Sequence, residues 1–114
     1  MKEVKRISLS ELRLMAEKSY IELVKANVDV ARRILVVDAE LHADIEAYMI
    51  DNGSRQEEIW GVNLYPKDYG TNDFIEFDSM INIRPSQKNQ SRYVQDENIR
   101  GLIVEIVNEV VYED

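Results

Sequence analysis

The sequence predicts an α+β fold in which a four-stranded antiparallel meander carries an N-terminal and a C-terminal helix on one face. Two amphipathic segments, one near each end of the chain, begin with residues that cap helices. Between them, apolar and polar residues alternate with a period of two, which is typical of half-buried strands. An Asn-Gly pair within this alternation predicts a hairpin. We therefore expect two layers, with both helices packed on the apolar face of the sheet.

The first helix is predicted to begin at Ser8. Ser8 and Glu11 have the spacing of a capping box, in which both side chains accept backbone N–H groups at the start of a helix. The apolar residues that follow at helical spacing are Leu9, Leu12 and Ala16. This pattern predicts a helix that ends near Tyr20.

A period of two begins at Val24 and predicts strand structure as far as Val37. Apolar residues first alternate with Lys25 and Asn27, and residues 34–37 are then a run rich in β-branched side chains. The pattern indicates either one long strand or two strands joined at a bulge near residues 31–33.

Residues 40–65 are predicted to form a hairpin. Residues 41–49 alternate between apolar and polar without exception. The Asn52-Gly53 pair that follows is a strong signal for a type I′ turn, which needs a positive φ at both central residues. The segment after the turn would then be the second strand of the hairpin.

The turn also predicts the register of this hairpin. Pairing about it places Ile45 opposite Trp60 on the apolar face, where we expect Trp60 to pack in the core. On the polar face, Asp44 lies opposite Gly61. A slip of one residue would move every side chain of the strand to the other face of the sheet. The register set by the turn is therefore supported by the apolar and polar pattern, because this register keeps the two kinds of residue on separate faces.

Residues 74–84 are predicted to be the fourth strand, paired so that Glu76 faces Asn63 and Asp78 faces Gly61. A polar, irregular segment follows. Asp96 can then cap the last helix. The apolar stripe of that helix is Ile99, Leu102, Ile103, Ile106 and Val110.

Two strings in the sequence carry a resemblance to a known family. They are ELHADIEAYMIDNGSRQEEIWGVNLYP and FIEFDSMINIRPSQKNQSR. From about Ser8 to its end, the chain resembles a family of small prokaryotic proteins known only as a domain of unknown function. The family has two glycines at the first hairpin turn, where this chain has Asp38 and Ala39. The resemblance implies one compact domain and brings no activity with it.

Composition indicates a single globular domain spanning residues 1–114, with 45% hydrophobic and 32% charged residues. Acidic residues number 22 against 14 basic ones, so the net charge of −8 makes nucleic acid and anionic lipid improbable partners. The absence of cysteine excludes disulfides, thiolate catalysis and cysteine zinc sites. The N-terminal residues lack a signal-peptide core, and no run approaches roughly 18 apolar residues, so we expect a cytoplasmic protein without a membrane span.

The polar face of the predicted sheet is the first candidate site. Gly61 would leave open space between carboxylates, and oxygen ligands with one imidazole suit Mg²⁺, Mn²⁺ or Ca²⁺. The candidate metal ligands are His42, Asp44, Glu46, Glu76 and Asp78. Two other interpretations remain open, namely a polar face exposed to water and a subunit contact in a homodimer.

The segment 84–92 is the second candidate site, because it carries three positive charges and no acidic residue in an acidic protein. Arg84 and Arg92 could hold a phosphate or carboxylate in bidentate fashion. The candidate ligand-binding residues are Arg84, Ser86, Gln87, Asn89 and Arg92, together with Asn63 and Arg33 from the polar face. The alternative is a solvated connector whose polar residues satisfy its own backbone.

Three functions are consistent with these patterns. The first is a module that binds a small polar or anionic ligand between the polar face and the 84–92 segment. The second is a metal-assisted hydrolase that uses the carboxylates of the polar face. The third is a homo-oligomeric interaction protein without chemistry. We rank binding first because no catalytic constellation is complete, and no residue is assigned a catalytic role.

Overall fold

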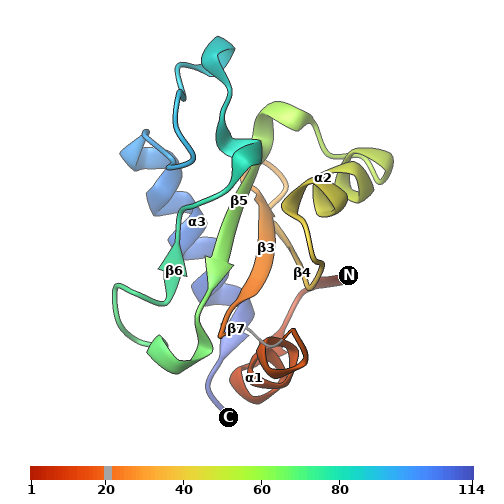
Figure 1. The fold of residues 1–114 in the computed structure, drawn as a ribbon, viewed down its shortest axis with the longest axis vertical. Coiled ribbons are helices and arrows are strands. Elements are labelled where there is room, and N and C mark those ends of the chain that lie inside the picture. The colour runs from red at the N-terminus through yellow and green to blue at the C-terminus, as the bar shows by residue number, and fades with distance from the viewer. Residues whose placement is uncertain (20–21) are drawn as a thin grey trace.

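A computed structural model describes residues 1–19 and 22–114. In this part of the chain, three α-helices accompany a five-stranded antiparallel sheet, which confirms the α+β class (Figure 1). From edge to edge the strands are β1 (Lys2–Val4), β4 (Ile34–Val37), β3 (Val24–Asp29), β5 (Ile59–Leu64) and β6 (Ile75–Glu76). A small parallel pair joins β2 (Ile7–Ser8) and β7 (Val111–Tyr112). No helix in the described residues is long and apolar enough to cross a membrane.

The first predicted helix is confirmed as α1 (Leu9–Lys18). The Ser8 hydroxyl accepts a hydrogen bond from the backbone N–H of Glu11 at 3.1 Å, so Ser8 caps the helix as its position predicted. The predicted end near Tyr20 lies outside the described residues.

The last predicted helix is confirmed as α3 (Glu97–Val110). The Asp96 carboxylate caps it by accepting the N–H groups of Asn98 and Ile99. Both α1 and α3 contribute to one hydrophobic core with the side chains on one face of the sheet. This core contains Trp60 with 2% of its surface exposed, so the prediction that Trp60 packs in the core is confirmed.

The predicted strand at residues 41–49 is wrong, because these residues form α2 (His42–Asp51). Ile45 and Met49 are four residues apart, which satisfies a helical period as well as an alternating one. Ala43, Glu46, Ala47 and Met49 are residues that favour a helix over a strand, and Ile45 is the one β-branched residue of the segment. The spacing of the apolar residues fits a helix and a strand equally well, and the helix propensity of the other residues decides in favour of the helix.

Asn52-Gly53 ends this helix and does not form a hairpin turn. Gly53 has the positive φ, +103°, that the pair predicted. Its N–H donates to the carbonyl of Ile50 at 3.2 Å, and the N–H of Ser54 donates to that of Met49 at 2.9 Å. These two bonds are those of a Schellman motif, which closes a helix with a glycine in the left-handed region.

Helix α2 covers the second face of the sheet, so the expectation of two layers with one exposed polar face is also wrong. Ile45 and Met49 of α2 pack with Val36 and Ile59 in a separate small core. In Figure 1, α2 lies on one side of β3 and β5, whereas α3 lies on the other. The polar side chains expected in solvent on β3 and β5 are therefore under a helix.

The strand predictions are confirmed only in part. Residues 24–37 form two strands, β3 and β4, but they pair as a tight antiparallel hairpin with Arg33 at φ 56° instead of continuing through a bulge. The predicted fourth strand is reduced to the two residues of β6, in which Glu76 pairs with Asn63 as predicted. Two 3₁₀ turns then replace the strand, η3 (Met80–Asn82) and η4 (Pro85–Gln87).

Gly61 is the point at which the segment after β6 rests on the sheet. The Asn82 side chain accepts the Gly61 N–H at 2.9 Å and donates to the Gly61 carbonyl at 3.0 Å, which takes the place of a backbone ladder. A Cβ atom at Gly61 would lie 2.7 Å from the Cβ and Oγ of Ser79 and 3.1 Å from Cδ2 of His42. The expectation that Gly61 leaves open space between carboxylates is therefore wrong.

We predict that Gly61→Ala lowers the free energy of unfolding by about 1–3 kcal/mol, because the added methyl group overpacks a buried contact. The matched control is Gly101→Ala in α3, where an added Cβ meets nothing within 4 Å. That change should raise stability by about 0.5–1 kcal/mol through helix propensity. Urea denaturation of both variants tests the pair, and equal stability of Gly61→Ala and wild type would contradict the close approach.

Candidate functional site

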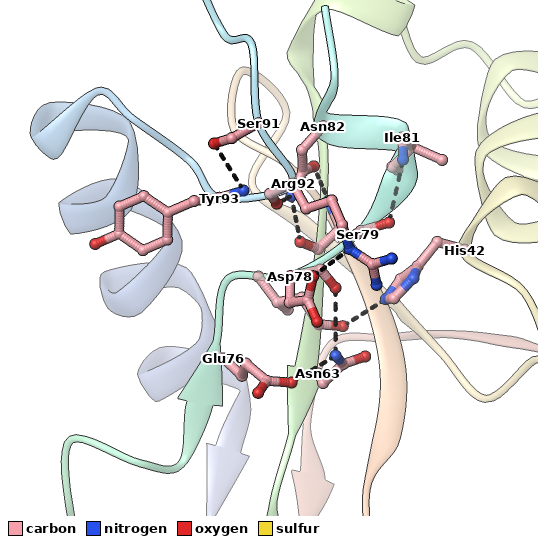
Figure 2. Close-up of polar contacts among 12 residues, drawn as sticks. His42, Asn63, Glu76, Asp78, Ser79, Ile81, Asn82, Ser91, Arg92 and Tyr93 are labelled. Carbon is pink, nitrogen blue, oxygen red and sulfur yellow. Dashed lines mark hydrogen bonds and ion pairs between the residues drawn. The ribbon is translucent and has the colours of Figure 1, made fainter.

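A pocket of about 440 Å³ lies where the N-terminus of α2 meets β5, β6 and the segment after β6 (Figure 2). Leu41 and Met80 are the exposed apolar side chains that line it, at 56% and 64% exposure. The remaining wall is mostly polar. Its charged or strongly polar side chains are Lys25, His42, Asn63, Tyr65, Glu76, Asp78 and Arg92.

Three of these side chains form a row across the sheet. Lys25 of β3 pairs with Asn63 of β5, which in turn pairs with Glu76 of β6. Directly opposed residues in antiparallel strands project to the same face, so all three point to the side of α2. Asn63 therefore separates a cation from an anion that lie two strands apart, about 10 Å at the backbone. No ion pair joins them in the described residues.

Asn63 is buried, with 6% of its surface exposed, and only half of its amide is satisfied. Nδ2 donates to Oε1 of Glu76 at 2.8 Å and to the Asp78 carbonyl at 3.3 Å. The Tyr65 hydroxyl donates to the same Glu76 oxygen at 3.0 Å, and burial with this contact raises the pKa of Tyr65. Oδ1 of Asn63 has no hydrogen-bond partner in the structure. Because the amide is planar, Oδ1 faces away from Glu76, toward the His42 side of the pocket in Figure 2.

His42 is the first residue of α2 and is held at both its backbone and its ring. Its carbonyl accepts a hydrogen bond from the Asn27 side chain at 3.0 Å. Nε2 lies 2.8 Å from the carbonyl oxygen of Val62, so this nitrogen carries the proton. Burial lowers the pKa of His42, with Lys25 and Arg92 acting in the same direction against the Val62 carbonyl and Asp78. At neutral pH the ring is therefore uncharged, and Nδ1 carries a free lone pair.

Two cationic side chains border the pocket, and one of them is paired with a carboxylate whereas the other is not. Nε of Arg92 donates to Oδ1 of Asp78 at 2.5 Å, and Figure 2 shows this guanidinium between Asp78 and His42. Lys25 is half-buried, and its ammonium forms no hydrogen bond or ion pair with the described residues. Lys25 is therefore the cation available to a bound group.

The N-terminus of α2 adds a further positive end to the pocket. The N-cap residue is Leu41, whose side chain cannot accept a hydrogen bond, and no side-chain cap is present. Leu41, His42 and Ala43 all line the pocket. The unsatisfied N–H groups of a first helical turn favour an anionic oxygen at this position.

The five predicted metal ligands do not share one face, because three of them lie on a helix. His42, Glu76 and Asp78 line the pocket, whereas Asp44 is exposed on α2. Glu46 does not line the pocket, and burial raises its pKa against the opposing charge of Arg84. Among the residues that the structure describes, no group of three or more histidine or acidic side chains could hold a metal ion.

Arg84, the first candidate of the 84–92 segment, is a buried residue whose guanidinium is bound to backbone. It donates to the carbonyls of Ile81 at 3.0 Å, Gln56 at 2.7 Å and Ile59. Its guanidinium also lies 4.3 Å from the centre of the Trp60 ring. The structure thus directs Arg84 and Arg92 to different partners.

The other candidates of that segment mostly support the loop. Nδ2 of Asn89 donates to three backbone carbonyls, and Gln87 donates to the Glu57 carbonyl at 2.9 Å. Ser86 is exposed. Arg33 pairs with Glu109 at 2.8 Å, on α3 and away from the pocket. Of the seven predicted ligand-binding residues, the pocket contains Asn63 and Arg92.

Sequence reasoning missed Lys25 and Tyr65 as members of the site. Lys25 could have been found, because it stands on the polar side of an alternating strand. Tyr65 belongs to the segment just past β5, and no signal distinguished it. Leu41 was also missed, because the helix that brings it to the pocket was predicted to be a strand.

Comparisons with known proteins give one result of use. A family model described as "Protein of unknown function (DUF5674)" matches residues 3–110, which confirms the resemblance seen in the sequence. No curated protein and no solved structure matches the chain. The comparisons therefore supply no activity, and the site must be interpreted from its own chemistry.

We predict that His42 makes stability depend on pH. Its unfolded pKa is about 6.5. Because the folded pKa is lower, the unfolded state takes up the proton first, and stability that is fully present above about pH 6.5 is lost as the pH falls through the folded value. The free energy of unfolding should therefore fall more steeply between pH 7.5 and 5.5 than in His42→Gln, which keeps a donor for Val62. Parallel slopes for the two proteins would contradict a buried neutral ring.

We also predict opposite outcomes for the two arginines of the 84–92 segment. Arg84→Ala should cost about 3 kcal/mol or more, because it leaves buried carbonyls without donors. Arg92→Ala should cost less than about 1 kcal/mol, because the Arg92–Asp78 pair is 53% and 41% exposed. Chemical denaturation measures both, and similar losses would mean that Arg84 is not the structural residue of the pair.

Proposed function

We propose that this chain, which belongs to the DUF5674 family of proteins of unknown function, binds a small polar molecule with an anionic group in the pocket at the N-terminus of α2. The proposal keeps the ligand-binding function that the sequence favoured. It moves the site from the 84–92 loop to the pocket lined by Lys25, His42 and Asn63.

The observation that carries the proposal is the unpartnered Oδ1 of Asn63. A buried acceptor without a donor costs about 1–3 kcal/mol, and native proteins leave few such groups. This oxygen belongs to a residue that is 6% exposed and lines the pocket. The oxygen itself is enclosed, so a ligand would recover that cost by donating a hydrogen bond after the side chains that enclose Oδ1 move apart. The unpaired acceptor thus supports a site that is complete only with its ligand.

The positive groups around the same pocket support an anionic group on that ligand. Lys25 has no counter-ion among the described residues, and the first turn of α2 has no side-chain cap. Both would be matched by a carboxylate or phosphate. The guanidinium of Arg92 has further N–H groups beyond the one that binds Asp78.

Binding is better supported than catalysis by the positions of the reactive groups. The Ser79 hydroxyl lies near His42, but both residues contact the Gly61 position, and His42 does so through Cδ2. The free nitrogen, Nδ1, is on the other side of the ring. This arrangement lacks the hydrogen bond that activates a serine nucleophile.

We predict that small carboxylates or inorganic phosphate raise the melting temperature of the wild-type protein, by several degrees at about 100 times Kd. Lys25→Gln should reduce the shift, because the anion loses its unpaired cation. The matched control is Lys5→Gln, which removes the same charge from an exposed residue that does not line the pocket. Thermal denaturation with each compound measures the shift. The proposal fails if no compound stabilises the protein, or if Lys25→Gln and Lys5→Gln respond alike.

A further inference from the structure

We propose that the ligand is a zwitterion, specifically an α-amino acid with an apolar side chain. This inference rests on the proposed function and names the class of molecule that the pocket would hold. Its basis is the distribution of charge, acceptors and apolar surface on the pocket wall.

The charges that line the pocket sum to zero. Lys25 and Arg92 are positive, Glu76 and Asp78 are negative, and His42 is uncharged at neutral pH. The chain as a whole carries a charge of −8, so this balance is local to the pocket. A ligand with both charge signs meets complementary groups here, whereas a dianion would face two carboxylates.

The carboxylate of the ligand has one clear position. Lys25 and the first turn of α2 both line the pocket, that turn has no side-chain cap, and the Lys25 ammonium has no anionic partner among the described residues. A carboxylate between them would accept from the ammonium of Lys25 and from backbone N–H groups.

The ammonium of the ligand has acceptors beside that position. Nδ1 of His42 carries a free lone pair, and the enclosed Oδ1 of Asn63 has no hydrogen-bond partner. Glu76 and Asp78 add negative potential from the neighbouring strand and segment. Lys25 and Asn63 are directly paired residues, about 5 Å apart at the backbone. An α-amino acid places its nitrogen about 2.5 Å from its carboxyl carbon, which suits two groups that lie so close.

Apolar surface at the mouth of the pocket would contact the side chain of the ligand. Leu41 and Met80 are more than half exposed, although both are large apolar residues. They come from two different elements, since Leu41 is the N-cap residue of α2 and Met80 lies in η3. Covering them stabilises a complex through buried apolar area, and methionine adapts to side chains of different shape.

The test is isothermal titration of the full chain with four probes of one carbon skeleton. L-Leucine has both charged groups, 4-methylpentanoate lacks the ammonium, 2-hydroxy-4-methylpentanoate replaces it with a neutral donor, and L-leucine methyl ester lacks the carboxylate. We expect L-leucine to bind at least about tenfold more tightly than each of the other three, because each analogue loses a charge-assisted hydrogen bond.

A variant tests which residue recognises the ammonium. Glu76→Gln removes the charge but keeps an oxygen that can accept from Asn63 and Tyr65. It should weaken L-leucine about tenfold and leave 4-methylpentanoate unchanged. The control is Glu3→Gln, an exposed residue outside the pocket, which should change neither affinity.

The outcomes separate the two proposals. If 4-methylpentanoate or the hydroxy acid binds as tightly as L-leucine, the zwitterion inference is overturned and the anion site stands. The same conclusion follows if Glu76→Gln weakens both probes equally. If the methyl ester binds as tightly as L-leucine, the carboxylate is not recognised and both proposals fail. Both also fail if none of the four probes, other carboxylates or phosphate binds.

Discussion

The hydrogen bonds between the Asn82 side chain and Gly61 are the contact on which the pocket depends. Beyond β6 the chain leaves the sheet, and nothing in its backbone pairs with this part of β5. The Asn82 amide replaces that pairing by accepting from and donating to Gly61, and it also donates to the Arg92 carbonyl at 2.9 Å. One side chain thus holds three segments together, and the wall that carries Asp78 and Met80 stands on it.

The absence of a side chain at Gly61 lets two walls of the pocket approach each other. Ser79 comes from one side and His42 from the other, and both contact the position that a Cβ would occupy. The hydrogen bond from His42 to the Val62 carbonyl then fixes the start of α2 on β5. The same glycine therefore determines where the N-terminus of the helix lies relative to Asn63. A polar face that would otherwise be open to water becomes one wall of a pocket.

The helix caps could be predicted from the sequence, because each depends on residues that are close together in the chain. The pairing of β5 with β6 could be predicted from the alternation of apolar and polar residues in the two strands. Ser8 and Asp96 cap the helices expected of them, and Glu76 meets Asn63. The error at residues 41–49 arose because their apolar residues satisfy both periods, and Gly53 ends a helix with the same positive φ that a hairpin needs. Of the candidate site, the residues on β5 and β6 could be predicted, because their strand pairing was correct. The positions of His42 and of the first turn of α2 over these strands could not be predicted, because residues 41–49 were predicted to be a strand.

The basic segment at residues 84–92 shows why a local charge contrast is weak support for a ligand. Arg84 is surrounded by carbonyls and an indole ring, so its charge is solvated by the protein itself. Burial lowers its pKa, while Glu46 and Glu57 act in the opposite direction. Arg92 is balanced by Asp78. Once these charges are assigned to partners, the cation of the pocket that has none is Lys25, which stands in an ordinary alternating strand. A charge that the described fold leaves unpaired is therefore better support for a ligand than a local excess of charge in the sequence. Unpaired charges can be identified only when the strand register and the burial of the residues are known.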